Sequence, residues 1–164
     1  MKHFVLVIIL LSAGFIYAQS NMGKSVPKFD PQANPTFELK KTIKLAKKEN
    51  KRIILDVGGE WCIWCHRIDE FIAQNKEINE FMHKNFVVLK INYSKENKNE
   101  KFLSRFPKIE GYPHFFVLEK NGKLLHSQNT GLLEKGKSYD PEKMMDFLKE
   151  WSIKGKAGKK KVKL

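Results

Sequence analysis

The chain has only two cysteines, Cys62 and Cys65, among its 164 residues. Two residues separate them, so a bond between them cannot cross-link distant parts of the chain. This spacing excludes the framework of long-range disulfides that staples many small exported domains. A lone close pair of this kind favours redox chemistry or metal binding instead.

Long hydrophobic runs are also lacking. The apolar run from Phe4 to Ala18 is shorter than the roughly 20 residues that a membrane-spanning helix needs. It follows a positively charged start and ends on small residues, as cleavable export signals do. We therefore expect residues 1–18 to be a signal peptide and the protein to be exported, to a bacterial periplasm or as a secreted protein. Phe15 stands where a lipoprotein signal carries its lipid-bearing cysteine, which excludes anchoring by that route.

Acidic residues are absent from the last eleven positions, which contain six lysines and contribute to a formal charge of +13. We expect residues 153–164 to be a solvated, disordered basic tail, with contact to anionic lipid or an acidic partner as the alternative. Prolines predict a linker over residues 19–33. Residues 34–152 then form one domain, and a hydrophobic content of 41% is enough for its core. We expect a monomer without a nucleic-acid partner.

Helical and strand patterns alternate along this domain. Short β-branched and aliphatic runs predict strands, spacings of three and four between apolar residues predict helices, and Asn121-Gly122 predicts a tight antiparallel hairpin. Asn34-Pro35 and Asp140-Pro141 have the pattern of a helix cap followed by proline. The expected helices cover residues 35–50, 61–73, 75–82, 100–106 and 141–151, and the expected strands cover residues 52–57, 86–93, 114–118 and 124–128. The alternation predicts an α/β fold, a mixed sheet covered by helices.

The cysteine pair lies at the start of a predicted helix that directly follows a predicted strand. A disulfide exchanger needs one accessible thiolate to attack and a second thiol close behind it to resolve the mixed intermediate. Free N–H groups and the helix dipole at a helix N-terminus would stabilise the thiolate of Cys62, while Cys65, one turn further in, would be shielded. The spacing and position therefore predict Cys62 as the attacking residue and Cys65 as the resolving residue.

The segment from Ile54 to Cys65 resembles the active-site strand and turn of thioredoxins. Asp56, six residues before the first cysteine, and Trp61, directly before it, match positions of that motif. The resemblance implies a thioredoxin-like fold, with helices on both faces of a central mixed β-sheet, and a catalytic role for Asp56 in proton transfer at Cys65. Tyr112-Pro113 is similar to the thioredoxin site whose cis proline faces the cysteines and helps to bind an extended substrate.

The resemblance also implies a function. We expect a thiol–disulfide oxidoreductase that acts on protein thiols and disulfides, needs no cofactor or metal, and is recharged by a membrane or soluble redox partner. Thioredoxins carry Gly-Pro between their cysteines where this chain has Ile63-Trp64, so reductase, oxidase and isomerase roles all stay open. Trp61, Trp64 and Tyr112 are candidates for an apolar substrate-binding surface, with plain packing as the alternative.

Other interpretations of the same residues remain. Cys62, Cys65 and His66 also fit the attachment pattern of a c-type haem, or could hold zinc or copper(I). A non-catalytic binding or folding-helper module with a static disulfide is a further alternative. Asp56 shares a strand face with Ile54, so it is buried with a raised pKa if helices cover both faces of the sheet, and otherwise faces water.

Overall fold

A computed structural model describes residues 28–155 of the chain. The predicted signal peptide, the part of the predicted linker up to residue 27 and the tail from residue 156 lie outside the described residues. The elements are α1 (Pro35–Glu49), β1 (Arg52–Gly58), α2 (Ile63–Gln74), α3 (Lys76–Asn85), β2 (Phe86–Asn92), α4 (Glu100–Leu103), β3 (His114–Leu118), β4 (Leu124–Asn129), the 3₁₀ helix η1 (Thr130–Leu133), β5 (Glu134–Lys135), β6 (Ser138–Tyr139) and α5 (Pro141–Trp151).

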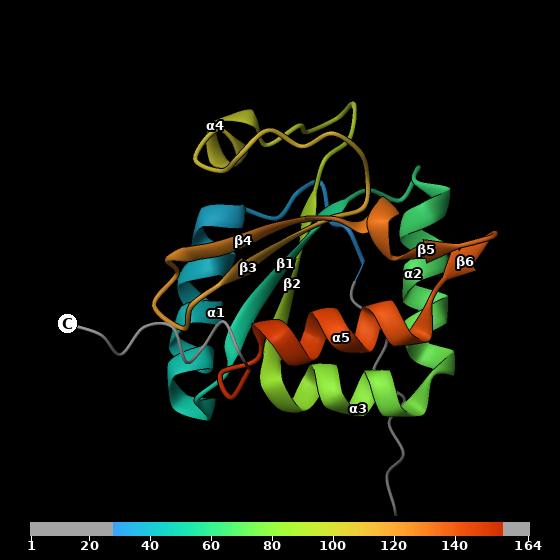
Figure 1. Cartoon of the computed structure of the whole chain (residues 1–164). Helices are drawn as coiled ribbons and strands as arrows, with labels where there is room; N and C mark the ends of the chain where they lie inside the picture. Colours follow the sequence, from blue (N-terminus) through green and yellow to red (C-terminus); the bar gives the residue numbers. More distant parts are fainter. Residues whose placement is uncertain (1–27, 156–164) are drawn as a thin grey trace, which may run out of the picture.

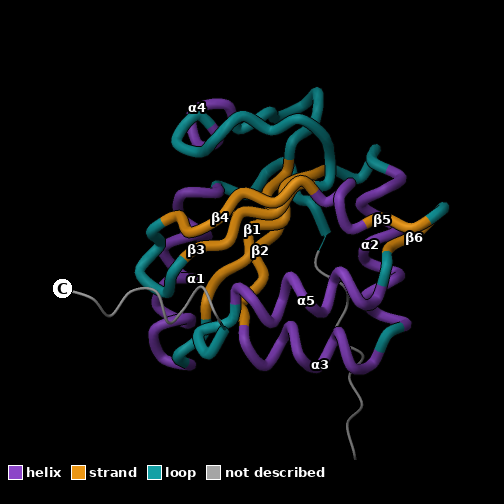
Figure 2. The backbone as a smooth tube through the Cα atoms, viewed as in Figure 1, coloured by secondary structure: helices purple, strands orange, loops and turns teal. Residues whose placement is uncertain are grey.

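The central sheet has the strand order β2-β1-β3-β4. β1 and β2 are parallel, whereas β3 is antiparallel to both β1 and β4. β5 and β6 form a separate two-stranded hairpin. Figure 1 shows α1 on one side of the central sheet and α3 and α5 on the other, and Figure 2 shows the strands between these helical layers. The predicted mixed sheet with helices on both faces is confirmed.

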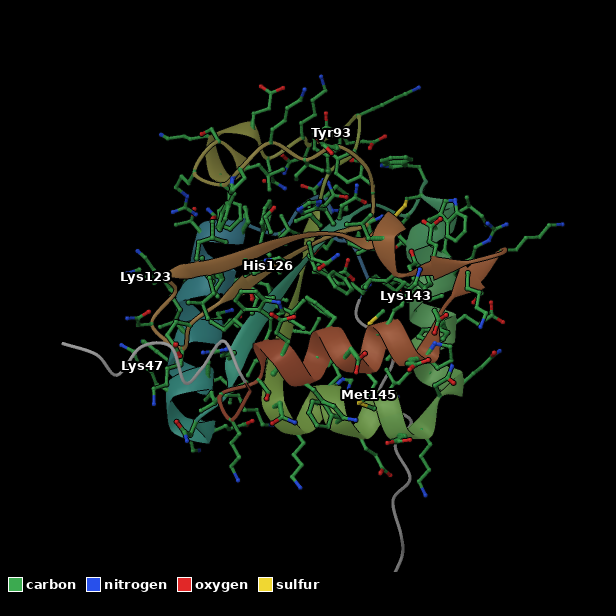
Figure 3. All side chains as sticks on the ribbon, in the orientation of Figure 1. Lys47, Tyr93, Lys123, His126, Lys143 and Met145 are labelled. Atoms are coloured by element: carbon green, nitrogen blue, oxygen red, sulfur yellow. A yellow bond between two sulfur atoms is a disulfide. The ribbon has the colours of Figure 1, made fainter. Side chains whose placement is uncertain are left out.

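The core lies in two layers, one on each face of the sheet. Ile54 and Phe115 face a layer formed with α2, α3 and α5, and Leu55 and Phe116 face a layer formed with α1 and α4. Figure 3 shows His126 of β4 on the side of α5, where its ring stacks on Trp151 at 4.3 Å. Burial on both faces explains why the interior of β1, from Ile53 to Val57, is apolar except for Asp56.

The predicted caps and hairpin form as expected. Asn34 Oδ1 accepts hydrogen bonds from the backbone N–H groups of Thr36 and Phe37 at the start of α1, and Asp140 caps α5 in the same way. Gly122 has a φ of 89°, in the region that glycine favours, and turns the chain between β3 and β4. Among the described residues, no helix has the length and apolarity needed to cross a membrane.

Candidate active site

The predicted site residues lie together at one edge of the central sheet. β1 and β2 both end there, and the backbone N–H of Tyr93 donates to the carbonyl of Gly58. β3 begins there, with His114 opposite Val57. Residues that follow β1 and precede β3 therefore lie together, which brings Cys62 and Pro113 to the same edge although fifty positions separate them. Figure 3 shows Tyr93 at this edge.

Cys62 is the N-cap of α2, and its sulfur is bonded to that of Cys65. The backbone N–H of Cys65 donates to Cys62 Sγ over 3.1 Å. The first turn of α2 contains no acidic residue, so nothing in that turn opposes negative charge on Cys62. The helix terminus therefore offers a hydrogen bond and a favourable dipole to a Cys62 thiolate.

Cys62 is less accessible than the sequence predicts. Its exposed fraction is 4%, and that of Cys65 is 0%. Phe29, Trp64 and Tyr112 pack around the pair and cover it. By contrast, the two residues that flank Cys62 in the sequence are exposed: Trp61 and Ile63 each have an exposed fraction of 59%. The disulfide thus lies beneath a rim of apolar side chains.

Two of the predicted surface aromatics lie together. Trp61 Nε1 donates to the backbone carbonyl of Tyr93 over 2.6 Å, and the Trp61 ring packs edge-on against Tyr112 at 5.7 Å. Tyr93 stacks on Tyr112 at 4.8 Å. Burial and the neighbouring Tyr93 raise the pKa of the Tyr112 hydroxyl. Tyr93 belongs to this cluster, although the sequence analysis did not single it out.

Trp64 belongs to a different surface. Its ring packs edge-on against Tyr139 at 5.8 Å, and the guanidinium of Arg67 lies 4.5 Å from the ring centroid. It also touches the layer formed by α2, α3 and α5. Trp64 therefore packs against the disulfide itself, whereas Trp61 packs against Tyr112.

Asp56 is buried, with an exposed fraction of 3%. Lys90 lies directly opposite it on β2, and its ammonium contacts Asp56 Oδ2 over 2.8 Å. The same ammonium contacts both oxygens of Asp69, on α2, over 2.8 and 2.9 Å. Within residues 28–155, no side chain or backbone group forms a hydrogen bond with Asp56 Oδ1. The buried cation therefore joins two carboxylates, one of which keeps an unpaired oxygen.

The protonation of this cluster follows from its burial. Burial raises the pKa of Asp56, Lys90 lowers it less strongly, and the nearby Asp69 adds to the rise. Burial opposes the charge of Lys90, but the charges of Asp56 and Asp69 outweigh it and raise the pKa of that ammonium. Lys90 thus stays charged, while Asp56 becomes a group that can accept and hold a proton.

Sequence analysis missed Lys90 and Asp69. A signal was present for Lys90, because it is the only charged residue in the strand Phe86–Asn92 and an unpaired buried lysine is costly. Asp69 gave no such signal, since charged residues are common on the outer face of a helix. Its contribution depends on the packing of α2 against the sheet.

Pro113 directly precedes β3. The Tyr112–Pro113 peptide bond is cis, as the resemblance predicts. The carbonyl of Pro113 accepts a hydrogen bond from the Thr130 hydroxyl at the start of η1. This contact ties the chain just before β3 to the chain just after β4.

His66 bears on the haem and metal alternatives. Its Nε2 lies 2.8 Å from the backbone carbonyl oxygen of Glu60, within the turn that leads to Cys62. Iron or metal ligation through Nε2 would require this nitrogen to leave the carbonyl, and use of the sulfurs would require the Cys62–Cys65 bond to be reduced. Within residues 28–155, no group of three or more His, Cys, Asp or Glu side chains is arranged to hold a metal ion.

Phe29 was assigned to the linker, yet it belongs to the packed domain. Its exposed fraction is 2%, and its ring contacts the cysteine pair. The ordered packing therefore begins before Asn34, where the sequence analysis placed its start. A single apolar residue between prolines gives no periodic signal, so the pattern alone could not assign it to the core.

A helix capped by Cys62 follows β1, and a buried acid and a cis proline lie at the same end of the sheet. This arrangement is that of a thioredoxin-like domain. The family model described as a thioredoxin-like domain matches residues 39–149, and the chain belongs to this family.

Individual relatives resemble parts of the chain. Spermatogenesis-associated protein 20 of Rattus norvegicus is 52% identical over 42 residues, which cover 26% of this chain and 5% of that protein. Disulfide bond reductase DsbH of Chlamydia pneumoniae is 25% identical over 89 residues, which cover 49% of this chain and 53% of that protein. The chain thus spans about half the length of DsbH and a small fraction of the rat protein.

Solved structures share the fold. The disulphide isomerase of Xylella fastidiosa Temecula1 superposes with a TM-score of 0.63 at 24% identity. The match covers 73% of this chain and 92% of that one. At this level of identity, the similarity shows the fold alone.

Proposed function

We propose that this chain is a thiol–disulfide oxidoreductase that exchanges disulfides with proteins through Cys62 and Cys65. The observation that carries the proposal is the Cys62–Cys65 bond at the N-cap of α2, in the same domain as a buried acid with a raised pKa. The reductase name of one relative agrees with this chemistry.

In the reducing direction, the Cys62 thiolate attacks one sulfur of a substrate disulfide and releases the other as a thiolate. Cys65 then gives its proton to the Asp56 carboxylate and attacks Cys62 Sγ. The Cys62–Cys65 bond forms again, and the second substrate sulfur leaves as a thiolate. The pair loses two electrons and the substrate gains them. The oxidising direction is the reverse.

The substrate would bind over the exposed rim of the site. Trp61 and Tyr112 offer apolar faces next to Cys62, Pro113 precedes an adjacent strand, and Trp64 borders the disulfide on the side of α2. An extended polypeptide could lie across Trp61 and Tyr112 and place its sulfur over Cys62. The apolar start of the sequence favours export of the protein, so we place this exchange outside the cytoplasm, with a membrane or soluble redox partner to recharge the pair.

The two cysteine variants test the proposal. With a protein disulfide as substrate, Cys62→Ser should abolish exchange, because no attacking thiolate remains. Cys65→Ser should instead trap the substrate on Cys62 as a mixed disulfide, visible as a mass increase on a non-reducing gel. Unaltered exchange by Cys62→Ser would remove the enzymatic interpretation.

A second candidate is a binding module with a static bond, which the low exposure of Cys62 favours. Treatment of the folded protein with dithiothreitol separates the two candidates, since a static bond resists reduction until the domain unfolds. For an exchanger, we expect a reduction potential within the span of about −270 to −120 mV that known exchangers cover, and a value near the lower end favours a reductase.

A further inference from the structure

Residues 28–33, here called the strap, lead into α1 and lie against the edge of the sheet that carries the disulfide. Figure 1 shows this blue segment running from the start of α1 toward the end of the sheet where α2 begins. The strap precedes the part of the chain that the family model matches, which starts at residue 39. The strap thus lies outside the matched residues, yet its Phe29 packs against the cysteine pair.

Two hydrogen bonds hold the strap in place. The backbone N–H of Phe29 donates to Glu60 Oε1 over 2.9 Å, within the turn before Cys62. Asn97 Nδ2 donates to the carbonyl of Pro31 over 2.9 Å. Asn97 is itself fixed, because its carbonyl accepts from the side chain of Asn92 at the end of β2. The strap is therefore tied both to the active-site turn and to the loop after β2.

The ring of Phe29 fills a space shared with the buried sulfur. A methyl group built on Gly58 would lie 2.5 Å from Cys65 Sγ and 3.1 Å from Phe29 Cζ, so sulfur and ring meet above this glycine. The ammonium of Lys90 lies 4.1 Å from the ring centroid. One aromatic ring thus contacts both the resolving cysteine and the cation that joins Asp56 to Asp69.

We propose that Phe29 is a positioning residue of the redox site, and that the strap keeps water away from Cys65 and Lys90. This proposal rests on the proposed function. With water excluded, the proton that leaves Cys65 Sγ during resolution goes to the Asp56 carboxylate, and the Lys90 ammonium is held against both acids. Without the ring, solvent reaches Cys65 and takes the proton in place of Asp56.

The test measures the reactivity of Cys65 directly. The full chain with Cys62→Ser carries Cys65 as its sole thiol, and alkylation by iodoacetamide is followed by mass spectrometry over a range of pH. Adding Phe29→Ala should raise the alkylation rate of Cys65 at least about tenfold, because the rate follows exposure and thiolate content. Phe29→Leu, which refills the space, should restore most of the protection. Phe37→Ala is the matched control, since that phenylalanine is 55% exposed on α1.

The pH profile separates positioning from simple loss of packing. In the Phe29→Ala chain, the alkylation rate should follow the titration of an ordinary solvated thiol, with a pKa of about 8.5. With Phe29 present, the dependence of the alkylation rate on pH should differ from that of an ordinary solvated thiol. Adding Asp56→Asn to the chain that keeps Phe29 should change this dependence again. Equal rates and equal profiles with and without Phe29 would overturn the proposal.

A second pair of variants covers the case in which Phe29→Ala fails to fold by circular dichroism. Glu60→Ala removes the acceptor that holds the strap but keeps the ring, whereas Glu60→Gln keeps an oxygen in the same place. Faster alkylation of Cys65 in the alanine variant than in the glutamine variant supports the strap, and equal rates overturn it. An unmodified chain that exchanges no disulfides while Phe29 still protects Cys65 would contradict the proposed function alone.

Discussion

Lys90 Nζ lies 2.8 Å from Asp56 Oδ2, directly across the pairing of β1 with β2. Parallel strands in register place the two side chains on the same face, and both are almost completely shielded from solvent. The same ammonium also binds Asp69, so one positive charge is shared by two carboxylates. The contact with Lys90 stabilises the buried Asp56 carboxylate. Burial nevertheless raises the pKa of Asp56 more than Lys90 lowers it.

Asp56→Asn should slow disulfide exchange near neutral pH by about a hundredfold, the low end of what positioned proton transfer contributes. The asparagine cannot accept the proton of Cys65, while Lys90 stays paired with Asp69, so the domain remains folded. The measurement is the lifetime of the mixed disulfide after rapid mixing with a substrate. In the unmodified chain, resolution should accelerate as pH rises through the raised pKa of Asp56, and this dependence should be absent from the variant.

The control for that experiment is Asp146→Asn. Asp146 is exposed on α5 and is far from the cysteines in the sequence. It should leave the lifetime of the mixed disulfide unchanged. Resolution by Asp56→Asn at the unmodified rate would remove Asp56 from the mechanism.

Lys90→Met should lower the free energy of unfolding by about 3–5 kcal/mol, the usual cost of leaving a buried charge without its partner. The loss depends on pH. The folded pKa of Asp56 is raised, and it should rise further without Lys90, so the destabilisation is small below the unfolded pKa near 3.8 and grows as pH rises through the folded value. Urea unfolding at several pH values measures both effects.

Two further chains test the cause of this loss. Asp56→Asn in the Lys90→Met background should recover part of the lost stability, because it removes the uncompensated carboxylate. Lys101→Met, at an exposed position, should change stability by less than about 0.5 kcal/mol. A double variant no more stable than Lys90→Met would show that the loss comes from packing rather than charge.

Local patterns predicted the elements well. The strand expected over residues 114–118 is observed as His114–Leu118, and Asn34 and Asp140 cap the helices that they were expected to cap. Strand and helix periodicities, caps and a hairpin turn are encoded in neighbouring residues, so one sequence is enough to read them. The helix expected over residues 100–106 is shorter, because α4 ends at Leu103.

Contacts between distant residues were not predictable in the same way. Lys90 reaches Asp56 because β1 and β2 pair in one register, and Phe29 reaches the disulfide because Glu60 binds its backbone thirty-one positions away. Neither contact leaves a periodic trace in the sequence. The short elements η1, β5 and β6 were also missed, since runs of two to four residues are below the length at which a pattern can be recognised.

His114→Gln should make the stability of the domain less sensitive to acid. Burial lowers the pKa of His114 to about 4, and its Nε2 lies 2.8 Å from the Ser127 hydroxyl. A lowered folded pKa means that the neutral ring stabilises the domain fully above the unfolded value near 6.5, and that this stability is lost as pH falls from 6.5 toward 4. Urea unfolding from about pH 7 to about pH 4.5 should therefore show a steeper decline for the unmodified chain.

Comparison of the two chains removes the opposing contribution of Asp56, which is present in both. His83→Gln is the surface control, because that side chain is exposed on α3. Its decline with acid should match that of the unmodified chain. If His114→Gln declines as steeply as the unmodified chain, His114 does not cause the acid sensitivity.

Gly58→Ala should destabilise the oxidised domain by about 1–3 kcal/mol, the typical cost of overpacking a filled core. A Cβ at this position would lie 2.5 Å from Cys65 Sγ and 3.1 Å from Phe29 Cζ, so the sulfur or the ring must move. Gly111→Ala is a matched control, because a Cβ there meets no atom of the described part of the chain within 4 Å. Thermal unfolding of both oxidised variants should show a clear loss for the first and almost none for the second. Equal melting temperatures of the two variants would mean that the disulfide and Phe29 are not packed against the end of β1. That result would also remove the contact by which the strap reaches the redox site.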